Sequence, residues 1–201
     1  AFSGIDINPL AVLLCRVKSG PFLVDALKDK SKDLYARIDE DFRGEIEISL
    51  PNRDKWFSRD VQLALSKVRR AIRKEDAVWA RRFFWVALAE TVRATSNSRT
   101  STFKLHIRTR EDIEERVCDP VGTFNRVLER NLQLYARQAS RLSEFGRLVL
   151  GSYQNDVAVS LADIRSVDEQ VQSDIIVTSP PYGDNTTTVP YGQYSYLPLQ
   201  W

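Results

Sequence analysis

The chain has 201 residues, of which 43% are hydrophobic and 28% are charged, and its formal net charge is +2. This balance is typical of a soluble globular protein, and no apolar run approaches the roughly 20 residues of a membrane helix. The first residues lack the basic leader and the cleavage site of a signal peptide. We therefore expect a cytoplasmic protein with no membrane contact. A nucleic-acid site would have to be local, because nucleic-acid-binding domains are usually more basic.

The chain opens with a short apolar run, FSGID at residues 2–6, which ends in an acid and is a candidate strand. Asn8 and Pro9 follow and predict a helix start, with Asn8 as the N-cap and Pro9 at the first helical position. We expect this helix to stop at the Gly-Pro pair of residues 20–21. A second amphipathic helix is expected over residues 22–42.

The middle of the chain has helical periodicity. Asp76 is expected to cap a helix that runs to about Arg93, and Asp119 precedes the longest periodic segment. One predicted helix face consists of Val61, Leu65, Val68 and Ile72, and the long segment carries a stripe of Phe124, Leu128, Leu132, Tyr135, Ala139, Leu142 and Phe145. The basic residues of two central helices are expected on solvated faces; they are Arg69, Arg70, Arg73, Lys74, Arg81 and Arg82.

The last fifty residues change character. NDVAVSLAD, residues 155–163, predicts a strand that ends in an acid, and SDIIVTSPPY, residues 173–182, predicts a strand that ends at a Pro-Pro pair. The stretch GDNTTTVPYGQYSY, residues 183–196, predicts a polar, aromatic loop. The whole pattern favours an α/β fold, in which residues 1–20 and 152–201 form a sheet core and residues 21–151 form a helical insertion.

Three candidate strands end in a polar or acidic residue: Asp6, Asp163 and Ser179. Ligands of open α/β sheets bind beyond the carboxyl ends of the strands. We therefore expect these three residues at the functional edge of the sheet, although a strand-end acid can also serve only as a helix cap.

Ser179, Pro180, Pro181 and Tyr182 form the candidate catalytic motif. Methylation of an exocyclic amino group requires acceptors for its hydrogens, so that the nitrogen lone pair points at the methyl donor. The Ser179 hydroxyl and a backbone carbonyl at a rigid Pro-Pro turn are suitable acceptors. Tyr182 can stack on a base that has swung out of the duplex. The alternative is a simple loop after a strand.

TSPPY after an apolar strand resembles the catalytic motif of the amino-methylating DNA methyltransferases, which use S-adenosylmethionine. GIDINPLAVLL and VSLADIRS resemble two cofactor-binding segments of the same enzymes, and GDNTTTVPYGQYS resembles a loop of a bacterial modification subgroup. The resemblance implies that Asp6 holds the cofactor ribose and that Asp163 accepts from the adenine amino group. It also implies a partial Rossmann-like methyltransferase sheet interrupted by a large helical insertion. Ser179 in the first motif position favours cytosine N4 over adenine N6 as the target.

The glycine-rich cofactor loop of that family is absent, and the eight glycines are scattered. The chain also begins with Ala and contains no Met. We therefore expect a missing segment upstream of Ala1, or a second chain, to carry the loop. Residues 1–201 alone should bind the cofactor poorly.

Residues 93–110 hold five cationic side chains and no acid: Arg93, Arg99, Lys104, Arg108 and Arg110. Such a stretch suits contacts to DNA phosphates, and the alternative is a solvated basic loop. With a single His, neither a serine-hydrolase triad nor a metal site is expected. Two other functions remain open: an RNA amino-methyltransferase, and a non-catalytic DNA- or partner-binding fragment of a split methyltransferase.

Overall fold

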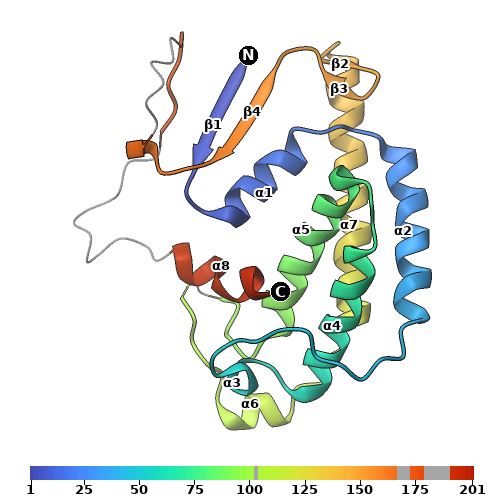
Figure 1. The fold of residues 1–201 in the computed structure, drawn as a ribbon, viewed down its shortest axis with the longest axis vertical. Coiled ribbons are helices and arrows are strands. Elements are labelled where there is room, and N and C mark those ends of the chain that lie inside the picture. Colours follow the sequence, from blue (N-terminus) through green and yellow to red (C-terminus); the bar gives the residue numbers. More distant parts are fainter. Residues whose placement is uncertain (102–103, 167–172, 179–190) are drawn as a thin grey trace.

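The computed structural model describes residues 1–101, 104–166, 173–178 and 191–201, and Figure 1 shows their arrangement. A short 3-10 turn spans Ile164–Ser166. The described strands are β1 (Phe2–Asp6), β2 (Leu148–Val149), β3 (Ser152–Tyr153) and β4 (Val157–Leu161). The described helices are α1 (Pro9–Lys18), α2 (Val24–Asp39), α3 (Arg53–Trp56), α4 (Arg59–Arg73), α5 (Val78–Thr95), α6 (Arg110–Glu114), α7 (Pro120–Glu144) and α8 (Tyr191–Gln200).

A parallel strand pair joins regions from opposite ends of the chain. β1 pairs with β4 in a register that runs from Phe2 opposite Val157 to Asp6 opposite Leu161. Helix α1 packs against this pair, and the Arg16 guanidinium donates to the Val159 carbonyl at 3.0 and 3.2 Å. The chain is therefore mixed α and β with a small, partial sheet, in agreement with the expected fold class. None of the described helices is long and apolar enough to span a membrane.

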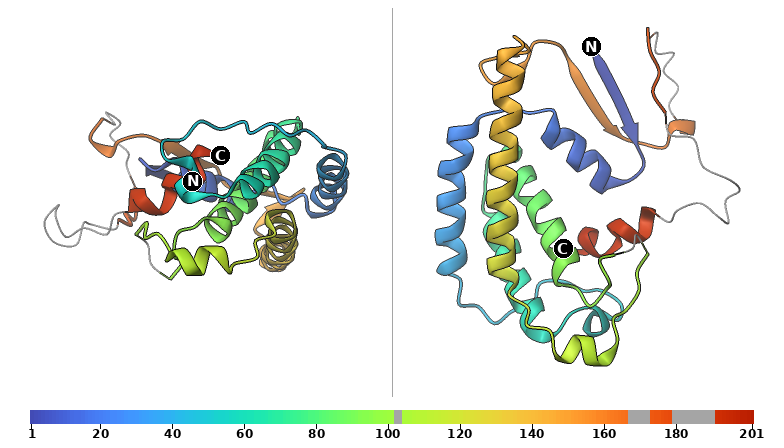
Figure 2. Two further views of the ribbon diagram at one scale, coloured as in Figure 1. Left: turned by 90° about the horizontal axis from the view of Figure 1, so that it is seen from below. Right: turned by 180° about the vertical axis from the view of Figure 1, so that it is seen from behind.

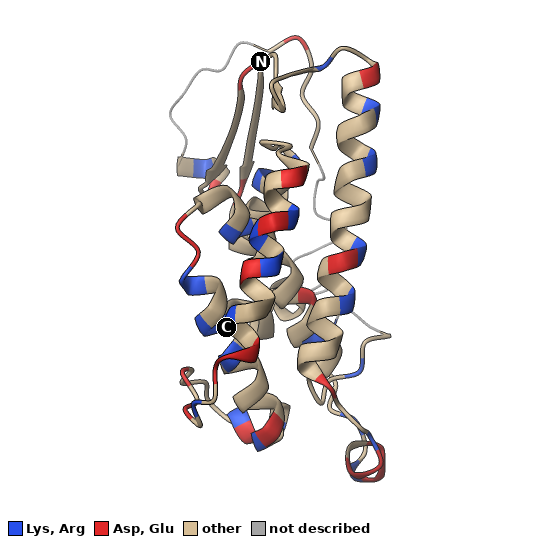
Figure 3. Ribbon diagram, turned by 90° about the vertical axis from the view of Figure 1, so that its right-hand side faces the viewer, with Lys and Arg blue, Asp and Glu red and all other residues tan. Residues whose placement is uncertain are grey.

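Helices α2, α4, α5 and α7 form a block with a closed apolar core (Figures 1 and 2). The predicted face of α4 is buried, as is the α7 stripe from Phe124 to Ala139. The stripe ends earlier than expected, because α7 stops at Glu144 and the exposed Phe145 is followed by Gly146 with a φ of 60°. Acidic and basic residues alternate along the helices in Figure 3, so this side carries both signs of charge.

One of the two predicted helix caps is confirmed. The Asn8 side chain accepts from the Leu10 backbone N–H at 3.0 Å, and Asp119 caps α7 in the same way by accepting from the Gly122 N–H at 2.9 Å. The cap predicted at Asp76 is wrong, because Ala77 is the N-cap residue of α5 and Asp76 is exposed. The neighbouring Glu75 accepts from the Ala77 N–H at 2.9 Å instead. Its buried carboxylate is held toward α5 by Lys30 and Arg37 of α2, at 2.7 and 3.1 Å.

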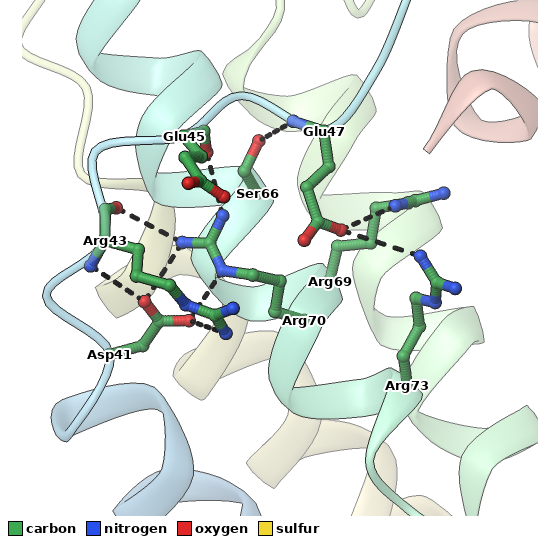
Figure 4. Close-up of polar contacts among 8 residues, drawn as sticks. All are labelled: Asp41, Arg43, Glu45, Glu47, Ser66, Arg69, Arg70 and Arg73. Carbon is green, nitrogen blue, oxygen red and sulfur yellow. Dashed lines mark hydrogen bonds and ion pairs between the residues drawn. The ribbon is translucent and has the colours of Figure 1, made fainter.

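The basic residues of α4 are not all solvated. Arg70 is 3% exposed, and its guanidinium donates to the Asp41 carboxylate at 2.6 and 3.1 Å and to the Glu45 carbonyl at 2.8 Å (Figure 4). Arg69 donates to Glu47 at 2.8 Å. A buried charge requires such partners, so these arginines fasten the irregular segment 41–50 onto α4.

Two local expectations near the C-terminus are wrong. Residues 175–177, Ile-Ile-Val, have no regular structure and are 80–91% exposed. A strand needs a hydrogen-bonded neighbour, and among the described residues this run has no ladder partner. Residues 191–196, expected in a loop, belong to α8. Burial of Leu197 and Trp201 favours the helix and overrides the weak helix propensity of this segment.

Candidate functional site

The two predicted cofactor acids lie at the same edge of the strand pair. Asp6 is the last residue of β1, and Asp163 lies two residues beyond the end of β4. Because β1 and β4 are parallel and Asp6 is opposite Leu161, both acids follow the carboxyl ends of neighbouring strands (Figure 1). This is the edge at which open α/β sheets bind ligands.

Asp6 has the geometry of an available acceptor. Asp6 is exposed, and its Oδ1 accepts from the Asn8 backbone N–H at 2.7 Å. An ionised carboxylate has about four acceptor positions, so this bond leaves capacity for two hydroxyl donors. Asp6 therefore keeps acceptor positions for a ligand at this edge of the strand pair.

Asp163 is engaged more fully within its own turn. Its carboxylate accepts from the Arg165 guanidinium at 2.5 to 3.1 Å and from the Arg165 backbone N–H at 3.0 Å. The side-chain hydrogen bonds from Arg165 lower the pKa of Asp163 to about 2, with a further contribution from the backbone bond. Asp163 is thus an ionised acceptor, but Arg165 occupies both of its oxygens.

The candidate catalytic motif, Ser179 to Tyr182, lies outside the described residues. The described chain resumes downstream of it with α8, which contacts α1 and α5. Three bonds fix α8. The Asn8 amide donates to Ser195 Oγ at 3.2 Å, the Leu105 N–H donates to the Gln193 side chain at 3.1 Å, and Arg69 donates to the Trp201 carbonyl at 2.7 Å.

Arg93, predicted to contact DNA, contacts α8 in the structure. Pro198 lies within α8 and has no N–H to offer the Tyr194 carbonyl four residues earlier. Arg93 donates to that carbonyl at 3.3 Å, and its guanidinium carbon lies 3.7 Å from the centre of the Tyr194 ring. Arg93 thus anchors α8 through a hydrogen bond and a cation–π contact.

The remaining basic residues lie on or beside a short hairpin, residues 97–108. Ser98 and Ile107 form an antiparallel bridge, and the Arg99 N–H donates to the His106 carbonyl at 2.8 Å. Arg99 and Lys104 are exposed in the part of the hairpin beyond the bridge. Arg108 is half-buried, and Arg110 begins α6 and pairs with Glu114 at 2.7 Å. The structure thus places two of the five cations in the exposed part of the hairpin, one at its base and two in the flanking helices α5 and α6.

Sequence reasoning missed the residues that hold α8. Ser195 and Gln193 lie in a segment without periodicity, so the sequence does not indicate that they hold α8. From the sequence, Asn8 is interpreted only as a helix cap, and its bond to Ser195 is not predicted. For Arg93 the local signal is Pro198, which has no N–H and so leaves the Tyr194 carbonyl in need of another donor. Among the described residues, no group of three or more His, Cys, Asp or Glu could hold a metal ion.

No protein-family profile matches the chain, and no solved structure matches it. The chain is 32% identical, over an alignment of 210 residues, to the type II methyltransferase M.MvaI of Kocuria varians. The alignment covers 98% of this chain but 45% of that protein, so the chain spans less than half the length of this relative. Over nearly its whole length, the chain is therefore similar to part of a type II methyltransferase.

Proposed function

We propose that the chain is part of an S-adenosylmethionine-dependent DNA methyltransferase that modifies an exocyclic amino group, with cytosine N4 favoured over adenine N6. The observation that carries this proposal is the shared edge of Asp6 and Asp163 at the carboxyl ends of β1 and β4. The similarity to a type II methyltransferase supports it independently.

In this proposal each group of the chain has one task. Asp6 accepts from the ribose hydroxyls, and Asp163 accepts from the adenine amino group when Arg165 gives up one oxygen. Bound S-adenosylmethionine supplies an electrophilic methyl group. Ser179 and a carbonyl of the Pro-Pro turn accept hydrogen bonds from the base amino group, so that its lone pair faces that methyl. Tyr182 stacks on the flipped base.

DNA contacts are proposed for the hairpin of residues 97–108. Exposed cations bind the phosphate backbone and position the duplex without reading its sequence. Arg99 and Lys104 are the main candidates, because both are exposed in the part of the hairpin beyond its bridge. Arg108, half-buried at the base of the hairpin, is a secondary candidate.

A second candidate function is a non-catalytic DNA- or partner-binding fragment of a split methyltransferase. The observation that favours it is the sparsely covered strand pair, in which Phe2 is 61% and Leu161 is 52% exposed. Parallel strands are normally covered on both faces.

The test of the proposed function is methyl transfer by the full-length protein. Unmodified genomic DNA and, in a separate reaction, RNA are incubated with methyl-labelled S-adenosylmethionine and digested to nucleosides. We expect the label in N4-methylcytosine. Label in N6-methyladenine would correct the target base, label in RNA alone would support an RNA enzyme, and no transfer to either would leave the binding function.

A further inference from the structure

Asn8 lies where the cofactor acid and the exit from the catalytic motif meet. Its backbone N–H donates to Asp6 Oδ1 at 2.7 Å, and its side-chain oxygen accepts from the Leu10 N–H at 3.0 Å. Its side-chain nitrogen donates to Ser195 Oγ at 3.2 Å. One residue therefore contacts the acid at the end of β1, the first turn of α1 and helix α8.

Ser195 is a well-buried partner for this contact. It is 2% exposed, and its hydroxyl also lies 3.4 Å from the Gly192 carbonyl. α8 begins at Tyr191, nine residues after Tyr182 of the motif. α8 is therefore the first described element downstream of the motif in the sequence.

The other contacts of α8 lead to different parts of the molecule. Arg93 and Arg69 tie it to the helical block, and Leu105 ties it to the hairpin. The bond from Asn8 instead leads to the turn between β1 and α1, which holds Asp6. Figure 1 shows α8 between α1 and the hairpin that follows α5.

We propose that Asn8 and Ser195 are a positioning pair that couples occupancy of Asp6 to the placement of α8. This inference rests on the proposed function. Donors bound at Asp6 restrict the turn of residues 6–8, which fixes the direction of the Asn8 amide and thereby the start of α8. Such preorganisation raises the rate of the chemical step, because small misplacements of reacting groups are costly. The coupling is reciprocal, so DNA that holds α8 in place tightens cofactor binding.

Two substitutions separate this role from helix capping. Asn8→Ser keeps an N-cap acceptor but removes the amide donor, and Ser195→Ala removes the acceptor. At saturating S-adenosylmethionine and DNA, we expect each change to lower kcat about fivefold, the effect of one net hydrogen bond. Cofactor affinity without DNA should stay within about twofold. The combined variant should be no slower than the slower single one, since both remove the same bond.

Ser31→Ala is the matched control. Ser31 is also 2% exposed, but its hydroxyl donates to the Leu27 carbonyl within α2, so kcat should not change. Additive losses in the combined variant, or an unchanged kcat in both single variants, would overturn the coupling.

Hydrogen exchange gives a readout that does not depend on activity. In Asn8→Ser the amides of residues 191–200 should exchange faster than in the parent protein, while those of α2 stay protected. Unchanged exchange in α8 would overturn the inference whether or not the protein is active. A parent protein that transfers no methyl group would instead contradict the proposed function, and the exchange result would still decide the contact.

Discussion

The helical block and the strand pair differ sharply in how their apolar residues are covered. In the block, Leu34, Phe84 and Phe124 are fully buried. In the strand pair, Phe2 and Leu161 keep more than half of their surface exposed, although both belong to parallel strands. The block therefore holds most of the apolar contacts that stabilise this chain.

Under the proposed function, the residues that stabilise this chain are separate from those that bind cofactor and DNA. Asp6 and Asp163 stand on the sparsely covered strand pair, and the hairpin cations stand at the surface. Substitutions in the block should change the free energy of unfolding, whereas substitutions at the edge should change binding or rate. The predictions below test this separation, from the largest expected effect to the smallest.

Phe84→Ala should have the largest effect on stability. Removal of this fully buried ring from α5 should lower the free energy of unfolding by about 3–5 kcal/mol, through lost burial and a residual cavity. Leu161→Ala in β4 should cost less than about 1 kcal/mol, because half of that side chain is already in water. Urea denaturation measures both. Equal losses would mean that the strand pair is as well packed as the block.

Asp41→Asn should be nearly as damaging, because it leaves the buried Arg70 guanidinium without its counter-charge. Loss of one partner of a buried ion pair costs about 3–5 kcal/mol, and the remaining carbonyl bonds to Arg70 place this case at the lower end. The control is Asp29→Asn, which breaks an exposed pair with Lys32 and should leave the urea midpoint unchanged.

The same carboxylate predicts a dependence on pH. Hydrogen bonds from Arg70 hold the pKa of Asp41 well below its ordinary value, against the opposing effect of burial. A carboxyl with a lowered folded-state pKa stabilises the fold above the unfolded pKa of about 4, and this contribution is lost as the pH falls further. Unfolding midpoints measured from pH 6 to pH 2.5 should therefore decline more steeply in the parent than in Asp41→Asn. Parallel curves would contradict the assignment.

Ser179→Ala should act on rate and leave stability unchanged. Loss of an acceptor at the reacting amino group should lower methyl transfer on the order of 10²-fold, by analogy with removal of one oxyanion-hole donor. Labelled-cofactor assays measure the rate, and circular dichroism checks the fold. Near-parental turnover would remove Ser179 from the mechanism.

Asp6→Ala should weaken cofactor binding without weakening DNA binding. Loss of charge-assisted hydrogen bonds to the ribose should cost roughly 1.5–3 kcal/mol of binding free energy, measured by calorimetry on the full-length protein. Asp25→Ala is a suitable control, since Asp25 is an exposed acid on α2. An unchanged cofactor Kd would reduce Asp6 to a structural acceptor for the Asn8 N–H.

Replacement of both Arg99 and Lys104 by Ala should have the smallest effect at any one salt concentration. Each phosphate contact contributes about −0.9 to the slope of log affinity against log salt, so the slope should flatten by roughly two units. Arg110→Ala should change it less, because Arg110 already pairs with Glu114. A parental slope in the double variant would identify the hairpin as a solvated loop, and a changed methylation site would identify it as a reader of bases.

The sequence by itself determined the features that depend on neighbours a few residues apart. The Asn8 cap, the buried face of α4 and the acid at the end of β1 follow from spacing and local bonding, and the structure has all three. The same reasoning is wrong at Asp76, which its position in the sequence predicts as the cap of α5. Ion pairs from α2 hold the Glu75 carboxylate toward α5, so Glu75 accepts from the first turn instead.

The tertiary structure alone decided which polar residues hold distant elements together. Arg70 is buried because segment 41–50 crosses it, and Arg93 is drawn to α8 because Pro198 leaves a carbonyl without its helical donor. Asn8 and Ser195 are 187 positions apart, and neither carries a local pattern that points to the other. Periodicity and capping record contacts within one or two helical turns, whereas contacts between the two ends of the chain exist only once its elements have packed.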